Sequence, residues 1–168
     1  IGYQGEFLTD TRGTGIMNRL FHAYAPYKGD VAGRRNGALI AIDKGEAVAY
    51  AIWNLQERGI MFIDPGDRVY EGMIVGEHSR DNDLEINVLK NKQLTNIRTT
   101  AKDEAVRLTP PIRMTLEKAL AYIEDDELVE VTPKSIRLRK KLLDPNDRKR
   151  DERRKEADLP QHLVNPNP

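Results

Sequence analysis

The residues best suited to chemistry lie between Lys90 and Lys102, where the sequence reads KNKQLTNIRTTAK. This stretch holds four cations and no acid, glycine or proline, and amides and hydroxyls fill most of the gaps. Lysine and arginine neutralise phosphates, while amides and hydroxyls hydrogen-bond to phosphate, sugar or base edges. We therefore predict an RNA-facing loop. A solvated loop whose charge only keeps the chain soluble is the alternative that composition leaves open.

The candidate contacts divide by the chemistry of their side chains. We expect the loop cations to contact RNA phosphates, and the amides and hydroxyls between them to bond to riboses and bases. Leu94 either packs on an exposed base or anchors the loop. Three arginines outside the loop are weaker candidates for contacts to the RNA backbone. The predicted RNA-binding residues are Lys90, Asn91, Lys92, Gln93, Leu94, Thr95, Asn96, Arg98, Arg80, Arg34 and Arg35.

The charges of the chain are segregated, although their sum is zero. Lysine and arginine number 27, as do aspartate and glutamate, yet the segment from Lys134 to Lys155 holds eleven cations against four acids. Such asymmetry points to a face that binds a polyanion. For residues beyond Asp144, a charged surface helix followed by a disordered end explains the same pattern.

Two other groups of residues could bind metal or do acid–base chemistry. His78, Asp81 and Asp83 carry donors that suit a divalent ion, but their spacing is not that of a calcium loop. We expect a polar turn that positions Arg80 instead. The acidic run at 124–127 is continuous, and we expect it to have no histidine or arginine partner. It is interpreted as a solvated helix exit or as the counter-charge of the basic segment 134–141.

Several classes of function are disfavoured by what the sequence lacks. The chain has no cysteine, which excludes disulfides and zinc–thiolate sites, and it has no Gly-x-x-x-x-Gly-Lys-Ser/Thr phosphate loop and no nucleophile elbow. We therefore expect this chain to be no enzyme and to hold no metal or cofactor. No apolar run approaches the roughly 20 residues that span a bilayer. We expect a cytoplasmic monomer without a membrane partner.

A length of 168 residues allows one modest core, or a small domain with a fragment of another. All twelve glycines lie at or before Gly76, so short strands are expected in the first half. We predict an α+β fold, mainly antiparallel β in a small barrel-like sheet, with one or two helices. One helix is expected after Thr115 and a polar one beyond Asp144. The expected strands are 16–24, 38–42, 47–52 (as a hairpin with 38–42), 60–63, 69–75, 84–88, 128–131 and 135–138.

Longer motifs resemble a known family. Residues 2–15, GYQGEFLTDTRGTG, resemble the later half of domain V of translational GTPases related to elongation factor G. There a helix leads through such a glycine-rich turn into the last strand of a ferredoxin-like domain. The rest of the chain, up to about Arg150, resembles the C-terminal domain specific to the BipA/TypA GTPases. The motifs that carry this resemblance are 34–37, 54–59, 69–72, 78–80, 82–84, 94–96, 103–105, 110–117 and 126–133.

The resemblance implies a division of the chain and a role. Residues 1–27 would end domain V, 28–143 would form the family's C-terminal domain, and 144–168 would form a basic polar helix and a disordered tail. The parent would be a ribosome-associated GTPase that acts in stress adaptation and large-subunit assembly, with GTP and magnesium bound in an upstream domain. The C-terminal domain would dock in the ribosomal A site.

The same resemblance places the family's probing loop on 89–100, where it would reach the tRNA acceptor end. The implied partners are rRNA, A-site tRNA and, as a further possibility, ribosomal proteins. The alternative from another class is a protein–protein module that binds a ribosomal protein or a regulator, in which case the charge of the loop is incidental.

Overall fold

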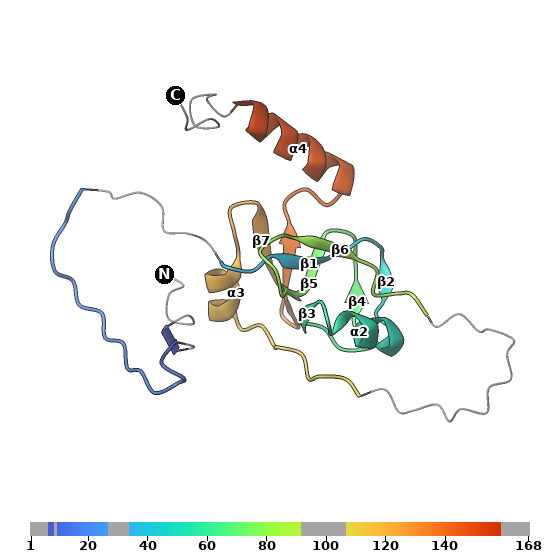
Figure 1. Ribbon diagram of the computed structural model, residues 1–168, viewed down its shortest axis with the longest axis horizontal. Coiled ribbons are helices and arrows are strands. Elements are labelled where there is room, and N and C mark those ends of the chain that lie inside the picture. Colours follow the sequence, from blue (N-terminus) through green and yellow to red (C-terminus); the bar gives the residue numbers. More distant parts are fainter. Residues whose placement is uncertain (1–6, 9, 27–33, 92–106, 159–168) are drawn as a thin grey trace, which may run out of the picture.

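The computed structural model describes residues 7–8, 10–26, 34–91 and 107–158 (Figure 1). The predicted α+β class, with mainly antiparallel strands, is confirmed, and the main sheet is open and does not close into a barrel. Within these residues the elements are β1 (Ala38–Ala41), β2 (Gly45–Glu46), α2 (Ala49–Leu55), β3 (Gly59–Met61), β4 (Arg68–Val69), β5 (Met73–His78), β6 (Leu84–Ile86), α3 (Leu116–Tyr122), β7 (Glu127–Val131), β8 (Ile136–Lys140) and α4 (Pro145–Asp158).

Strand β5 is the centre of the six-stranded sheet, whose order is β6-β1-β5-β8-β7. One edge of β5 pairs with β1, while β8 and β3 share the other edge, β8 near Met73 and β3 near His78. All of these pairs are antiparallel, and only β1 with β6 is parallel. Gly76 fits this crowding, because a Cβ there would lie 2.6 Å from the carbonyl oxygen of Ile60. Strands β2 and β4 form a separate two-stranded sheet.

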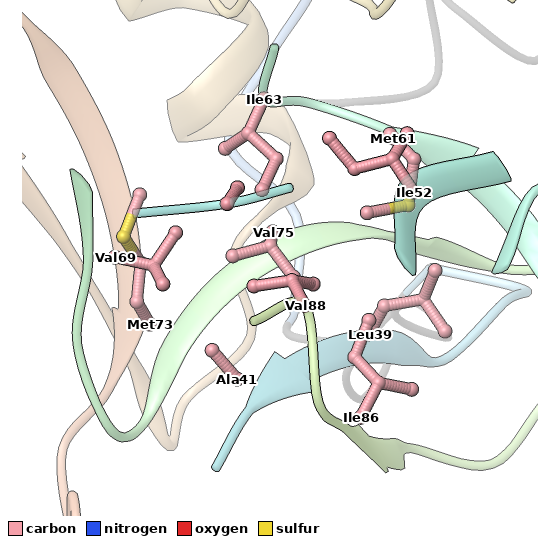
Figure 2. Close-up of a cluster of buried hydrophobic side chains, with 11 residues drawn as sticks. Leu39, Ala41, Ile52, Met61, Ile63, Val69, Met73, Val75, Ile86 and Val88 are labelled. Atoms are coloured by element: carbon pink, nitrogen blue, oxygen red, sulfur yellow. The ribbon is translucent and has the colours of Figure 1, made fainter. Parts of the chain in front are cut away.

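Both faces of the main sheet are covered, which explains why all four residues of β1 are buried. On one face, Leu39 and Val75 pack with Ile52 of α2 and with Val69 of the small sheet (Figure 2). On the other face, Ile40, Ile74 and Leu138 lie side by side on neighbouring strands and pack with Ala119 of α3. A strand buried on two faces is apolar throughout instead of alternating.

The two helices expected from the sequence are present. The Thr115 side chain accepts a hydrogen bond from the Lys118 amide at 3.3 Å and caps α3, as the N-cap preference of threonine predicts. Helix α4 is polar along its length, and Asp144 caps it by accepting from the Asn146 amide at 2.6 Å. No helix in the described ranges is long and apolar enough to cross a membrane.

The predicted hairpin of 38–42 with 47–52 is wrong. Residues 49–55 form α2, which buries Ala51 and Ile52. The physical reason is that both edges of β1 are already occupied, by β5 and by β6, so no edge remains for a returning strand. The apolar run therefore covers the sheet face as a helix.

Two other predicted strands also differ. The segment 69–75 is divided between β4 and β5 by a turn in which Gly72 has a φ of +79°, a conformation that favours glycine. Phe7 and Leu8 are helical, as expected for the end of a helix. The Gly13 amide donates a hydrogen bond of 2.7 Å to the Leu8 carbonyl and so ends this helix. Residues 16–24, however, form no strand, because no described strand lies beside them to accept their backbone hydrogen bonds.

The two-sided burial of β5 can be tested with two isoleucines. Ile74→Ala should lower the free energy of unfolding by about 2–5 kcal/mol, because Ile74 is 1% exposed and its loss leaves a cavity. Ile60→Ala, on the neighbouring β3 but 48% exposed, should cost less than about 1 kcal/mol. Urea denaturation measures both values. Equal costs would contradict the burial described for β5.

Candidate nucleic-acid interface

The predicted RNA-binding loop leaves the body directly after β6. Val88 is buried, and its carbonyl accepts a hydrogen bond of 2.9 Å from the amide of Val48. Leu89 is half-buried, whereas Lys90 and Asn91 are exposed. The other loop candidates, namely Lys92, Gln93, Leu94, Thr95, Asn96 and Arg98, lie outside the described residues and stay predictions.

Beyond the cationic segment, the described residues resume at Arg107, where the chain is again fixed to the body. Leu108 packs against the core cluster beneath α2, and the Gln56 side chain accepts a hydrogen bond from the Thr109 amide. The same side chain donates to the Arg107 carbonyl at 3.4 Å. Val48 is the N-cap of α2 and Gln56 is its C-cap. The described residues on either side of 92–106 are therefore fixed to the two ends of one helix.

Helix α2 also carries an aromatic pair, exposed Trp53 and half-buried Tyr50, that sequence reasoning missed. Trp53 is 46% exposed, and its ring centroid lies 6.2 Å from that of Tyr50. Aromatic side chains next to cations are what proteins use to stack unpaired bases. The available signal in the sequence was that Trp53 is the one tryptophan of the chain.

Arg35 and Arg80 stay candidates for RNA contacts. Both side chains are exposed, and neither forms an ion pair with another residue in the described ranges. The Arg80 carbonyl accepts a hydrogen bond of 2.7 Å from the Gly37 amide, so the two arginines lie near the same edge of the body.

The prediction that Arg34 contacts RNA is corrected, because its guanidinium faces inward. Its side chain is 9% exposed and donates to both oxygens of Glu127, at 2.6 and 2.7 Å. It also contacts Asp83 at 3.3 Å and lies 4.5 Å from the ring centroid of Tyr122. A charge used in this way is not available to phosphate, so Arg34 is a structural residue of the scaffold.

Lys140 completes a buried ion network around Glu127, whose side chain is 0% exposed. The ammonium of Lys140 is 3% exposed and lies 2.6 Å from Asp83, 2.9 Å from Asp126 and 2.9 Å from Glu127. The prediction that the acidic run is a counter-charge for 134–141 is confirmed through Lys140. The expectation that this run lacks an arginine partner is wrong, because Arg34 is 93 residues from Glu127 in sequence and beside it in the fold.

The network shifts the pKa of its members. Burial acts to lower the pKa of Lys140, but hydrogen bonds to Asp126, Asp83 and Glu127 outweigh it, and the pKa is raised. Burial likewise opposes ionisation of Arg34, whose pKa is nonetheless raised, mainly by the hydrogen bond to Glu127. For Asp83, burial acts to raise the pKa, but the Ala38 amide with Lys140 and Arg34 outweighs it, so the net shift is downward. All three groups are thus held in their charged forms.

The same geometry argues against a metal site in the described residues. Oxygens of Glu124, Asp126 and Glu127 come within 4.8 Å of one another, but Arg34 and Lys140 already supply the positive charge there. His78 is buried, with Nδ1 at 2.6 Å from the Asn82 carbonyl. Asp83 meets the Ala38 amide and Lys140 instead of sharing a ligand with His78.

The described residues define a domain of the α+β class, in which the segments that flank the cationic stretch are fixed to a short helix. The family model of the TypA/BipA C-terminal domain matches residues 36–145. The chain belongs to this family. It is similar to proteins named large ribosomal subunit assembly factor BipA: 50% identical over 158 residues to that of Bacillus subtilis, 54% over 154 residues to that of Escherichia coli K12, and 53% over 154 residues to that of Haemophilus influenzae.

These matches cover 94%, 91% and 91% of this chain but 26%, 25% and 25% of the relatives. The chain therefore spans about a quarter of the length of the curated proteins it matches. The domain boundaries at 27 and 143 stay predictions.

Removal of one member of the buried network should be costly. Glu127→Ala leaves Arg34 and Lys140 without their shared partner and should destabilise the chain by about 3–5 kcal/mol. The control is Lys155→Ala, which removes an exposed pair with Asp151 and should cost less than about 0.5 kcal/mol. Thermal and urea unfolding give both values. A Glu127→Ala chain as stable as the control would show that the network does not hold the fold together.

The lowered pKa of Asp83 predicts a specific loss of stability in acid. Because its pKa is below the ordinary value of 3.8 in the folded state, the stabilisation is present above that pH and is lost as pH falls through the folded pKa. Asp83→Asn should be less stable than the parent at pH 7 and should lose less stability below about pH 4. Asp81→Asn, an exposed neighbour, should keep the parental profile. Identical acid profiles of parent and Asp83→Asn would refute the assignment.

Proposed function

We propose that this chain is the ribosome- and tRNA-binding C-terminal module of a BipA/TypA translational GTPase. It docks in the ribosomal A site and inserts its basic loop toward the tRNA acceptor end, in stress adaptation and large-subunit assembly. Relatives named as large ribosomal subunit assembly factors support the ribosome as partner. The observation that carries the proposal is the attachment to α2 of Val88 and Arg107, which flank the cationic segment, with Lys90 and Asn91 exposed where that segment begins.

The proposed roles of the body and of the loop depend on the two attachments to α2, at Val48 and Gln56. The sheet and α2 form a platform, and the cations Lys90, Lys92 and Arg98 contact phosphates of rRNA or tRNA. Twenty residues separate Val88 from Thr109, so the loop can extend no more than about 30 Å from α2 before it must return. Trp53, between these attachments, offers a ring on which an unpaired base can stack.

In this proposal, nucleotide binding and hydrolysis belong to the rest of the parent protein. GTP and magnesium bind in an upstream domain, and nucleotide hydrolysis belongs there. Residues 1–27 complete the ferredoxin-like domain V, which fits the exposure of Ile16, Leu20 and Phe21 in this chain. The parent acts in the cytoplasm, where the ribosomes are.

The loop can be tested in the intact protein with Lys90, Lys92 and Arg98 changed to alanine. Binding to purified large subunits should weaken, and the slope of log K against log salt should fall by about 2 to 3, because three phosphate contacts are lost. A matched control removes the same charge from α4, at Lys149, Arg153 and Arg154, and should leave both quantities unchanged. Sedimentation with subunits at several salt concentrations measures them.

Unchanged affinity and salt slope in the loop variant would refute the loop as the RNA contact. If Leu120→Lys, an exposed apolar position on α3, then abolished subunit binding, the protein–protein module would be the correct function instead.

A further inference from the structure

A concave surface lies between β8 and the segments that precede β4 and α3. It is a groove of about 340 Å³, lined by residues of three stretches of chain that are far apart in the sequence, within 62–74, 113–114 and 134–138. Clefts of this size are typical of small-ligand sites. Phe62, Met114 and Ile136, all half-buried, line it on the apolar side.

Cations dominate the polar lining of this groove. Arg68 of β4, Arg113, Lys134 and Arg137 of β8 face it, and Asp67 is the one acid among the lining residues of the described chain. Because the whole chain has no net charge, this excess is a property of the fold and not of the composition. Another groove of the described structure, beside α4, has nearly equal numbers of charges of both signs in its lining, six acids and five cations.

Two of the four cations are available to a ligand. Arg113 is held by Asp64 and lies 3.9 Å from Asp67, which fixes its place at the rim. Arg68 lies 3.6 Å from Glu46 in a pair that is mostly exposed and therefore weak. Lys134 and Arg137 form no ion pair with any residue in the described ranges.

We propose that this groove is a second RNA-binding site, which takes one nucleotide of a single strand. Its phosphate lies on Lys134 and Arg137, and its ribose and base cover Phe62, Met114 and Ile136. An acidic peptide would satisfy the cations but would leave this apolar side uncovered. The inference rests on the proposed function, because it adds a contact to the same ribosome-bound RNA besides those of the loop.

The test uses the intact protein in which the three loop cations are already alanine, so that remaining RNA binding reports on the groove. The probe is a fluorescein-labelled single-stranded RNA of ten nucleotides, followed by anisotropy. Lys134→Ala with Arg137→Ala should weaken binding about tenfold and lower the salt slope by about 1.4, for two single-strand phosphate contacts. Lys134→Arg with Arg137→Lys should retain binding, and circular dichroism should show that both variants fold.

Lys44→Ala with Lys118→Ala removes the same charge at two exposed positions outside the groove and outside the basic segment 134–155, and should have no effect. An equal loss in this control, or no loss in the groove variant, would overturn the proposal. So would AMP or a ten-residue polyglutamate that binds as tightly as the RNA and depends equally on Lys134 and Arg137. Large-subunit binding by the unmodified protein is measured in parallel: its absence, with groove-dependent RNA binding retained, would reject the proposed function and leave the groove site intact.

Discussion

The described fold depends on the compensation of one carboxylate that is removed from water. Glu127 is fully buried and is shared by Arg34 and Lys140, which Asp83 and Asp126 bind in turn. These residues come from the segment before β1, the turn before β6, the turn before β7 and the end of β8. A buried ion pair contributes little stability when complete but costs several kcal/mol when one partner is removed. The network therefore favours the arrangement of these four segments in which both cations meet carboxylates.

That arrangement also sets where the cationic loop leaves the body. Asp83 accepts the Ala38 amide at 2.7 Å, which joins the start of β1 to the turn that leads into β6. The parallel pairing of β1 with β6 then delivers Val88 to the N-cap of α2, and Gln56 at the other end of that helix holds the returning chain. The two attachment points lie about 12 Å apart, given the rise of a helix over the eight residues from Val48 to Gln56. The described residues on both sides of 92–106 are therefore fixed to one short helix.

The sequence indicated those features that local patterns encode. The period-two alternation at Leu84 and Ile86, the threonine cap of α3 and the strands around Thr132 are all present. The helix at 49–55 was missed because an apolar run shows burial and does not show which sheet edges are free. Arg34 was assigned to the surface because its partner Glu127 is distant in sequence. The groove at Lys134 and Arg137 was invisible for the same reason, since three separate stretches of chain build it. Local composition did single out the cationic loop, whose flanking residues the fold then attaches to α2.

On the ribosome, we expect the cationic loop to lie directly against RNA. The chain has no cysteine, so Asn91→Cys, in an intact protein whose upstream cysteines are replaced, creates a single attachment point for an iron chelate at the exposed start of the loop. Directed hydroxyl-radical cleavage of subunit-bound protein is the most direct measurement. We predict strand breaks clustered in the rRNA that lines the A site near the peptidyl-transferase centre, and in the tRNA acceptor end when tRNA is present. Bound protein that produces no cleavage from this position, or cleavage only at sites remote from that centre, would contradict this placement of the loop.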